Sequence, residues 1–282
     1  GGRYWVRSAI GLPIALALGA EALDGLLQGA AAMDVHFATA PLAANAPVQL
    51  ALAGLANRNA FGYASLNIAP YDARLVHLVP YLQQLEMESL GKSVDLEGRP
   101  VTVPTGPVVW GMPGTDGQHT FFQWLHQGPE GAPVDFIICR EPDHPYPEHH
   151  RLLVANCLAQ REALLRGKSA SVLEAELAAK ETDPAHVSWL ARHKTHPGGR
   201  PSTLIVLPRL SAHALGALLA LYEHKVFVQG LVWGINPYDQ WGVEYGKVLA
   251  TGIGRELAGK APAGGHDAST AYWVAQWGNG GM

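Results

Sequence analysis

The stretch AFGYASLNIAP at residues 60–70 decides how the chain can fold. Its aromatic residues and alternating apolar residues are typical of a strand. Pro70, Tyr71 and Asp72 then favour the start of a helix, which we expect to run to about Ser89. A strand that passes directly into a helix is the building unit of α/β proteins, in which helices cover a mostly parallel sheet.

Strands and helices continue to alternate beyond this unit. Short apolar runs predict further strands at residues 107–110, 134–139, 203–207 and 231–233. Longer segments predict helices at residues 118–127, 148–166, 171–180 and 212–228. The alternation predicts a parallel sheet with helices on both faces, a doubly wound, flavodoxin-like α/β domain. Ligands of such sheets bind beyond the carboxyl ends of the strands, so we expect the loops after Pro70, Trp110 and Trp233 to face one crevice.

The residues before this domain have a helical pattern. The segment AIGLPIALALGA at residues 9–20 is apolar but too short to span a bilayer, and we interpret it as a buried helix. Residues 34–57 predict another helical stretch, in which Pro41 and Pro47 mark a bend. The chain begins with Gly1 and not with methionine, which we interpret as a processed or truncated start.

Composition narrows the class of protein. The 282 residues are 48% hydrophobic with a formal net charge of −4, which argues against a basic nucleic-acid binder and against a membrane partner. The two cysteines, Cys139 and Cys157, have no CxxC spacing, so buried reduced thiols in a reducing cytoplasm are the simplest interpretation. The histidines and acids at residues 143–150 match no standard metal-ligand spacing.

The stretch GLVWGINPYDQWGVEYGK at residues 230–247 joins the last expected strand to a polar turn and a helix. Asp239 is placed to cap that helix. Residues seven apart on a helix differ by about 700°, nearly two full circles, so Gln240 and Lys247 are expected on one face with Glu244. Taken alone, such a pattern is more often an ordinary exposed ion pair between Glu244 and Lys247, with Gln240 in solvent.

Two other segments carry candidate chemistry. In QQLEMESLGK at residues 83–92, a helix places Gln84, Glu88 and Lys92 one turn apart, although such a pattern alone is usually a solvated face. In GTDGQH at residues 114–119, a helix opens after a strand, where backbone N–H groups favour anions. Without further context, His119 would more often be a packing or capping residue.

Four short sequence motifs together resemble those of the glucose-6-phosphate isomerase family. They are YDQWGVEYGK at residues 238–247, MESLGK at 87–92, WGMPGTDGQH at 110–119 and GGRY at 1–4. The resemblance runs from Gly1 to about Gly259 and covers the carboxyl-terminal half of the family's protein. The sequence departs from the family pattern at Trp5, at Arg7 and at Leu90. At the position of Leu90 the family usually has asparagine.

The resemblance implies a sugar isomerase (SIS) fold divided into three parts. Residues 1–57 would be the end of a preceding SIS domain with connecting helices, residues 58–235 a second SIS domain, and residues 236–282 a carboxyl-terminal helix and tail. An amino-terminal half that holds the sugar phosphate would lie outside this sequence. The segment YEHK at residues 222–225 resembles a family segment that we interpret as framework, with His224 hydrogen-bonded in place.

The resemblance also implies roles for six residues. Glu88 would be the base that moves a proton between the first two sugar carbons, and Arg3 would stabilise the enediolate. His119 and Lys247 would assist ring opening, with His119 acting in the neighbouring subunit of a homodimer, and Gln84 and Gln240 would bind substrate. The implied enzyme interconverts glucose 6-phosphate and fructose 6-phosphate in the cytoplasm, in glycolysis and gluconeogenesis, and uses no metal or cofactor. The alternatives are a non-catalytic sugar-phosphate-binding SIS module and an inactive fragment that lacks its amino-terminal half.

Overall fold

The computed structural model describes residues 2–4, 6–262 and 264–278. The chain forms two compact units, Gly1–Pro237 and Tyr238–Met282, and each is described by itself. The proposed division at residues 57 and 235 rests on the family resemblance and stays a prediction.

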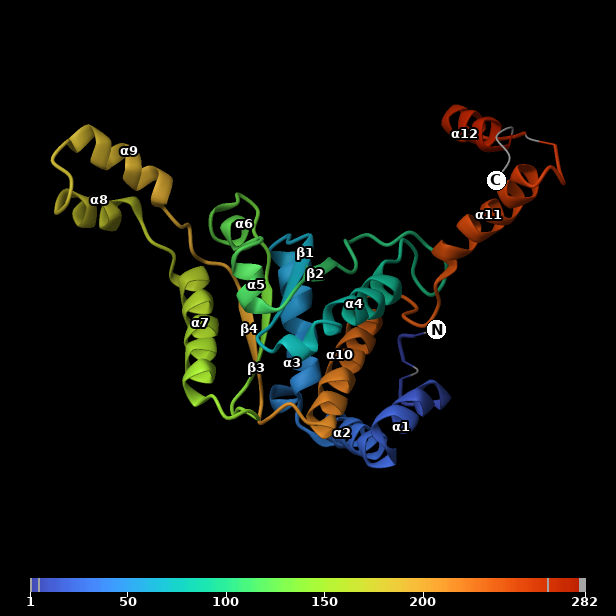
Figure 1. Cartoon of the computed structure of the whole chain (residues 1–282), viewed down its shortest axis with the longest axis horizontal. Coiled ribbons are helices and arrows are strands. Elements are labelled where there is room, and N and C mark those ends of the chain that lie inside the picture. The colour runs from blue at the N-terminus through green and yellow to red at the C-terminus, as the bar shows by residue number, and fades with distance from the viewer. Residues whose placement is uncertain (1, 5, 263, 279–282) are drawn as a thin grey trace. The chain divides into compact units, whose positions relative to one another are not determined.

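A four-stranded parallel sheet forms the centre of the first unit (Figure 1). Its strands are β1 (Ser65–Pro70), β2 (Val108–Gly111), β3 (Val134–Cys139) and β4 (Ser202–Leu207), in the order β2-β1-β3-β4. All three pairings are parallel, and Ile68 of β1 lies opposite Asp135 of β3. The expected α/β class and four of the five expected strands are confirmed.

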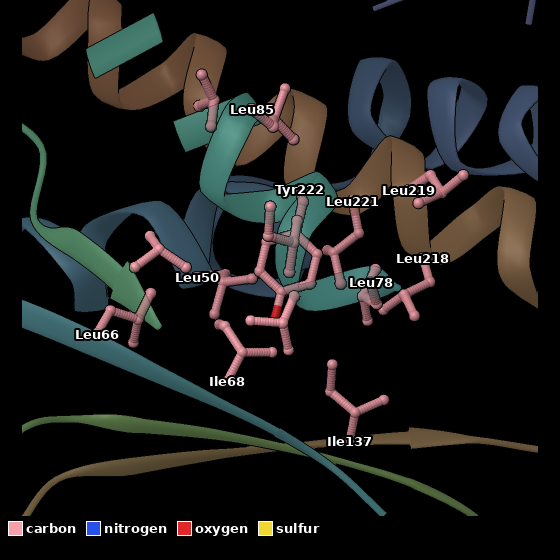
Figure 2. Close-up of a cluster of buried hydrophobic side chains, with 14 of the residues drawn as sticks. Leu50, Leu66, Ile68, Leu78, Leu85, Ile137, Leu218, Leu219, Leu221 and Tyr222 are labelled. Carbon is pink, nitrogen blue, oxygen red and sulfur yellow. The ribbon is translucent and has the colours of Figure 1, made fainter. Parts of the chain in front are cut away.

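Helices cover both faces of this sheet, because the buried strands are apolar on both sides. Ile68 and Ile137 point to one face, where they join a core with Leu218 and Tyr222 of α10 (Ala212–Trp233). Figure 2 shows this cluster, with the Tyr222 ring extending from the helix toward the strands. Burying each such side chain contributes about 1.5–3 kcal/mol to the stability of the fold, so this core fixes α10 against the sheet.

The opposite face has its own core. Ala69 and Phe136, the neighbours of Ile68 and Ile137 along their strands, pack there with residues of α6 (Phe122–Gln127) and α7 (Pro147–Arg166). Figure 1 shows α7 on one side of the sheet and α3 (Ala46–Leu55) and α10 on the other. The sheet is therefore doubly wound, as expected.

The remaining elements of the first unit are short or lie outside the sheet. They are η1 (Ala9–Gly11), α1 (Leu12–Leu18), α2 (Ala20–Thr39), η2 (Leu42–Ala44), η3 (Ala56–Ala60), η4 (Ala73–Leu75), α4 (Leu78–Leu82), η5 (Gln83–Glu88), α5 (Gly114–Gln118), α8 (Ala170–Ala178) and α9 (Pro184–Lys194). The helices expected at residues 148–166 and 171–180 correspond to α7 and α8, whereas α9 was not expected.

The strand expected at residues 231–233 is wrong, because these residues form the last turn of α10. The helix ends at Gly234, which adopts a left-handed conformation with φ of 66° and donates its N–H to Gly230 and Leu231. Three apolar residues cannot distinguish a strand from a helix end. The helical spacing of buried Val226, Gln229 and Trp233 decides for the helix.

The helix expected to be buried at residues 9–20 is α1, and its burial is wrong. None of the described α1 residues is buried, and Leu16 is 78% exposed. Apolar composition indicates a helix with an apolar surface, but it does not indicate what covers that surface. The bend marked by Pro41 and Pro47 is confirmed, since α2 ends at Thr39 and α3 begins at Ala46.

The helix expected at residues 118–127 is two helices. The chain leaves α5 at Gln118 and enters α6 at Phe122, so His119 lies in the connecting turn. The helix expected from Pro70 to Ser89 is likewise composite, since η4, α4 and η5 follow one another before the chain turns at Gly91.

The second unit contains η6 (Trp241–Val243), α11 (Glu244–Leu257) and α12 (Ala268–Gly278). The expectation that Asp239 caps the helix is wrong, because helical structure begins at Trp241 and Gln240 occupies the capping position. Among the described residues, only α10 is long and apolar enough to cross a membrane, and most of it is buried as the core helix of the first unit.

Candidate active site

The first part of the site is the turn that follows α4. η5 is a π-helical segment, a wider turn that is rare and often found at functional sites. Leu85 and Leu90 are fully buried in the core that lies between the sheet and α10, and this burial fixes the turn. Gln84 and Glu88 point outward, and the Glu88 side chain is 22% exposed.

The second part is the amino-terminal segment, which brings Arg3 to this turn. The Arg3 side chain is 7% exposed, and its Nε lies 3.5 Å from Oε2 of Glu88. Its Nη1 donates to Oγ of Ser89 and to the carbonyl of Pro237, each at 3.0 Å. A guanidinium held by two such hydrogen bonds is a fixed positive charge, pre-oriented against the carboxylate.

Two further contacts fix the backbone that carries Arg3. The Tyr81 hydroxyl lies 3.0 Å from the carbonyl oxygen of Arg3 and 3.1 Å from Oε1 of Glu223. A Cβ added to Gly2 would lie 2.9 Å from Oε1 of Gln84, so glycine permits this close approach. The structure therefore brings Arg3, Gln84 and Glu88 together, from segments more than 80 residues apart.

His119 lies elsewhere in the first unit. Its side chain is exposed at the end of α5, and it makes none of the contacts that join Arg3, Glu88 and Ser89. The turn itself is fixed, because Nε2 of Gln118 donates to the hydroxyl of Tyr71 at 2.9 Å. Burial raises the pKa of Tyr71 to about 12, so this hydroxyl stays protonated. A Cβ at Gly114 would lie 2.0 Å from the Tyr71 ring, which excludes any larger residue there.

Gln240 and Lys247 belong to the second unit. Lys247 is exposed in the first turn of α11, together with Glu244. The expectation that Gln240 shares this face is wrong, because Gln240 precedes η6 with φ of −153°, outside any helix. A helical projection holds only where the helix is continuous, and here it starts too late to include Gln240.

The YEHK segment of α10 supports the site as framework, as expected. Nε2 of His224 lies 2.7 Å from Oδ1 of Asp34, and its ring stacks on Phe37 at 4.2 Å between centroids. Glu223 pairs with Arg7 and also contacts Tyr81, and burial raises the pKa of Glu223. The sequence analysis assigned no role to Tyr81 or to Ser89, although Ser89 lies within the MESLGK motif at residues 87–92.

The departures from the family pattern are accommodated. Leu90 is fully buried in the core, and Arg7 forms ion pairs with Glu223 and Asp34. Trp5 lies outside the described residues. Both cysteines are free and buried, as expected, and burial raises the pKa of Cys157 to about 12.

The residues considered as a metal cluster are engaged elsewhere. Asp143 pairs with Arg74, and Nε2 of His150 lies 3.2 Å from the carbonyl of Arg140. Across the ranges that the structure describes, no group of three His, Cys, Asp or Glu side chains could hold a metal ion.

Comparison with known proteins identifies the family of this chain. A family profile described as phosphoglucose isomerase matches residues 1–274. The chain is 68% identical over 276 residues to the glucose-6-phosphate isomerase of Bordetella petrii, with 97% of this chain and 53% of that protein covered. It is 54% identical over 270 residues to the glucose-6-phosphate isomerase of Chlorobium luteolum, with 96% of this chain and 49% of that protein covered.

A solved structure gives the same result. The crystal structure of a glucose-6-phosphate isomerase from Chlamydia trachomatis superimposes with a TM-score of 0.80 at 37% identity, covering 98% of this chain and 50% of that one. The fold and site thus define a doubly wound α/β protein with a carboxylate and a fixed guanidinium beside its core helix. The chain belongs to the phosphoglucose isomerase family. It spans about half the length of the curated relatives it matches.

Proposed function

We propose that this chain is the carboxyl-terminal half of a glucose-6-phosphate isomerase, an aldose-ketose isomerase that interconverts glucose 6-phosphate and fructose 6-phosphate. The observation that carries the proposal is the pairing of Glu88 with the fixed guanidinium of Arg3. Moving a proton from one sugar carbon to the next takes a base and leaves a negatively charged intermediate. The pair supplies a base and a positive charge in one place.

The proposed reaction is balanced within the sugar. The Glu88 carboxylate takes the C2 proton of the open-chain aldose, the electrons of that C–H bond form the C1–C2 double bond, and the π electrons of the C1 carbonyl move to O1, which gives a cis-enediolate. The proton of the O2 hydroxyl passes to O1 through the cis-enediol, C2 becomes the carbonyl carbon, and Glu88 returns its proton to C1, which gives the ketose. The Arg3 guanidinium stabilises the negative charge on oxygen without transferring a proton, so its contribution depends on being held in place beforehand.

The other predicted residues complete the proposal. His119 and Lys247 assist opening of the sugar ring, and Gln84 and Gln240 hold the substrate. The exposed positions of His119 and Lys247 suit groups that act on a substrate held by several surfaces. We propose that His119 acts in the neighbouring subunit of a cytoplasmic homodimer in glycolysis and gluconeogenesis, and that an amino-terminal half holds the phosphate. We propose the domain division of the family for this chain: the end of a preceding SIS domain at residues 1–57, a second SIS domain at 58–235, and a carboxyl-terminal helix and tail at 236–282.

Isotope exchange at C2 of the sugar tests the assignment of the base in the full-length protein that contains this chain. Glu88→Gln keeps the size of the side chain and removes the proton acceptor, so exchange should fall by about 10²- to 10⁴-fold. Glu97→Gln changes an exposed carboxylate nine residues away and should leave exchange unchanged. Near-normal exchange in Glu88→Gln would reject the assignment.

A sugar-phosphate sensor is distinguished by pairing two measurements on the same preparation. Calorimetry reports binding of hexose phosphate, and a coupled assay reports turnover. Binding without turnover would indicate a non-catalytic module, and neither signal would indicate an inactive fragment. The proposed enzyme gives both signals.

A further inference from the structure

A second charged pair lies beneath the site, in the interior of the first unit. Nζ of Lys225 on α10 lies 2.6 Å from Oε1 of Glu86 on η5. Lys225 is 1% exposed and Glu86 is 0% exposed, so both charges are removed from water. Lys225 is one of the largest fully buried side chains in the described part of the chain.

A buried ion pair is energetically unfavourable as a link between α10 and η5. Removing both ions from water costs free energy that their mutual attraction often fails to recover, and an apolar pair of similar volume is usually as stable. Here the pairing is also incomplete, because Oε2 of Glu86 is buried without a hydrogen-bond partner among the described residues. Stability alone therefore does not account for the pair, which favours a role in fixing one arrangement.

The pair belongs to a cluster that joins the sheet to the turn. Asp135 of β3 is 4% exposed, and the Tyr222 hydroxyl donates to its Oδ2 at 3.1 Å. Burial raises the pKa of Glu86 and of Asp135, and the Lys225 ammonium opposes that rise in both. The Lys225 ammonium of α10 thus lies near two carboxylates, that of Glu86 on η5 and that of Asp135 on β3.

Glu86 is two residues before Glu88 in the same π-helical turn. Successive residues of such a turn point in different directions, so Glu86 enters the core while Glu88 faces Arg3. A π-helical turn is less favourable than an α-helical one, and its rotation has to be fixed by contacts outside the turn. The buried bond from Lys225 to Glu86 is directional and supplies that constraint.

The same stretch of α10 also fixes the other half of the site. Glu223, two residues before Lys225, contacts the Tyr81 hydroxyl, which lies against the carbonyl of Arg3. One turn of the core helix therefore reaches Glu88 through Glu86, and Arg3 through Tyr81.

We propose that Lys225 and Glu86 are positioning residues, whose buried pair sets the rotation of η5 so that the Glu88 carboxylate stays against the Arg3 guanidinium. This inference rests on the proposed function, in which Glu88 is the base. Misplacement of a reacting group by about 1 Å can cost about 100-fold in rate, so a turn that rotates slightly should lose much of its activity.

The test replaces both charges together in the full-length protein. Glu86→Leu with Lys225→Met keeps the core filled, and Asp135, which loses the cation, keeps its hydrogen bond from the Tyr222 hydroxyl, so the melting temperature should stay within about 5 °C of the parent. We expect kcat to fall by about 10- to 100-fold with KM changed less than about threefold. Leu164→Ala, a cavity in the opposite core, should lower the melting temperature and leave kcat unchanged.

A second measurement separates positioning from general loosening of the fold. If the pair acts through Glu88, the fold-decrease in kcat caused by Glu88→Gln should be at least tenfold smaller in the Glu86→Leu/Lys225→Met background than in the parent, because the base is already misplaced there. Independent effects that multiply would overturn the inference.

The outcomes also separate this inference from the proposed function. Hexose-phosphate isomerase activity absent from the parent would reject the proposed function, and full activity of Glu88→Gln would reject Glu88 as the base, on which the positioning role depends. Loss of activity in Glu88→Gln, with kcat of the double variant within twofold of the parent, would reject only the positioning role. Should the double variant fail to fold, Glu86→Asp keeps both charges and withdraws the carboxylate by one methylene. A lowered kcat at unchanged KM would then support positioning, and an unchanged kcat would overturn it.

Discussion

The turn that carries Glu88 and the helix that carries Lys247 are built in opposite ways. η5 is held from below by buried Leu85 and Leu90, and Glu88 contacts a guanidinium that is itself hydrogen-bonded twice. α11 has no buried residue, and Lys247 is exposed along with the rest of its turn. The first unit thus positions its charged groups by its own packing, whereas α11 does not.

The difference shows how the two sets of residues can contribute to one reaction. Proton transfer depends on sub-ångström placement, and the groups proposed for it are fixed by a core. A group that assists ring opening can be carried by an exposed helix if the substrate brings it into place. α11 also exposes the large side chains of Tyr245 and Val248.

The largest expected effect comes from a comparison of two lysines. Lys225→Met alone leaves the Glu86 carboxylate buried without its partner and should reduce the free energy of unfolding by about 3–5 kcal/mol. Lys247→Met removes an exposed charge and should leave the unfolding midpoint unchanged while lowering activity. Urea unfolding of both variants measures the contrast. Equal stability of the two would show that the first unit does not depend on its interior pair.

Arg3→Met tests the fixed charge of the site. It removes the group proposed to stabilise the enediolate, and kcat/KM should fall by about 10²- to 10³-fold, the range seen when one oxyanion-stabilising donor is lost. Arg3→Lys keeps a charge but not the two-pronged geometry, and should recover only part of the loss. Full recovery would mean that charge alone matters, and that the contacts to Ser89 and Pro237 do not.

A smaller effect is expected at the end of α10. Gly234 has φ of 66°, and a Cβ there would meet no atom within 4 Å. Gly234→Ala should therefore reduce the free energy of unfolding by about 1–2 kcal/mol through backbone strain alone. Activity should be unchanged if η5 depends on the middle of α10 and not on its end. A loss of activity larger than the loss of stability would contradict that separation.

The smallest effect concerns pH and a group remote from the site. Burial raises the pKa of Cys157 to about 12, from an ordinary value of 9.0, so the unfolded chain loses this proton first as the pH rises. The stabilising contribution is therefore complete below about pH 9 and is lost progressively toward pH 12. Unfolding midpoints from pH 8 to 10.5 should fall less steeply in Cys157→Ala. Rapid alkylation of native Cys157 at pH 8 would contradict the assigned burial.

Much of the fold could be predicted because its signals are local. β1 and β3 are apolar runs bounded by turn residues, and α7 is a long periodic segment. The predictions that were wrong concern ends and surroundings. Residues 231–233 are too few to show a period, and the apolar α1 gives no sign of what lies beside it.

The site was predicted less completely. Glu88, Arg3 and Gln84 were selected by their resemblance to family motifs, and their proximity appears only in the structure. Tyr81 and Ser89 were assigned no role, although both contact Arg3 and Ser89 lies within the MESLGK motif. A hydroxyl that bonds a backbone carbonyl or a guanidinium leaves no periodic trace in a sequence.

The sequence by itself determined the α/β class and the four strands of the sheet, because hydrophobic periodicity is a property of neighbouring residues. Only the tertiary structure decided that Arg3 meets Ser89 across 86 positions and that Lys225 meets Glu86 across 139. Those contacts depend on how α10 packs against the sheet and η5. That packing follows from the shapes of side chains from several elements at once, and no single stretch of sequence contains it.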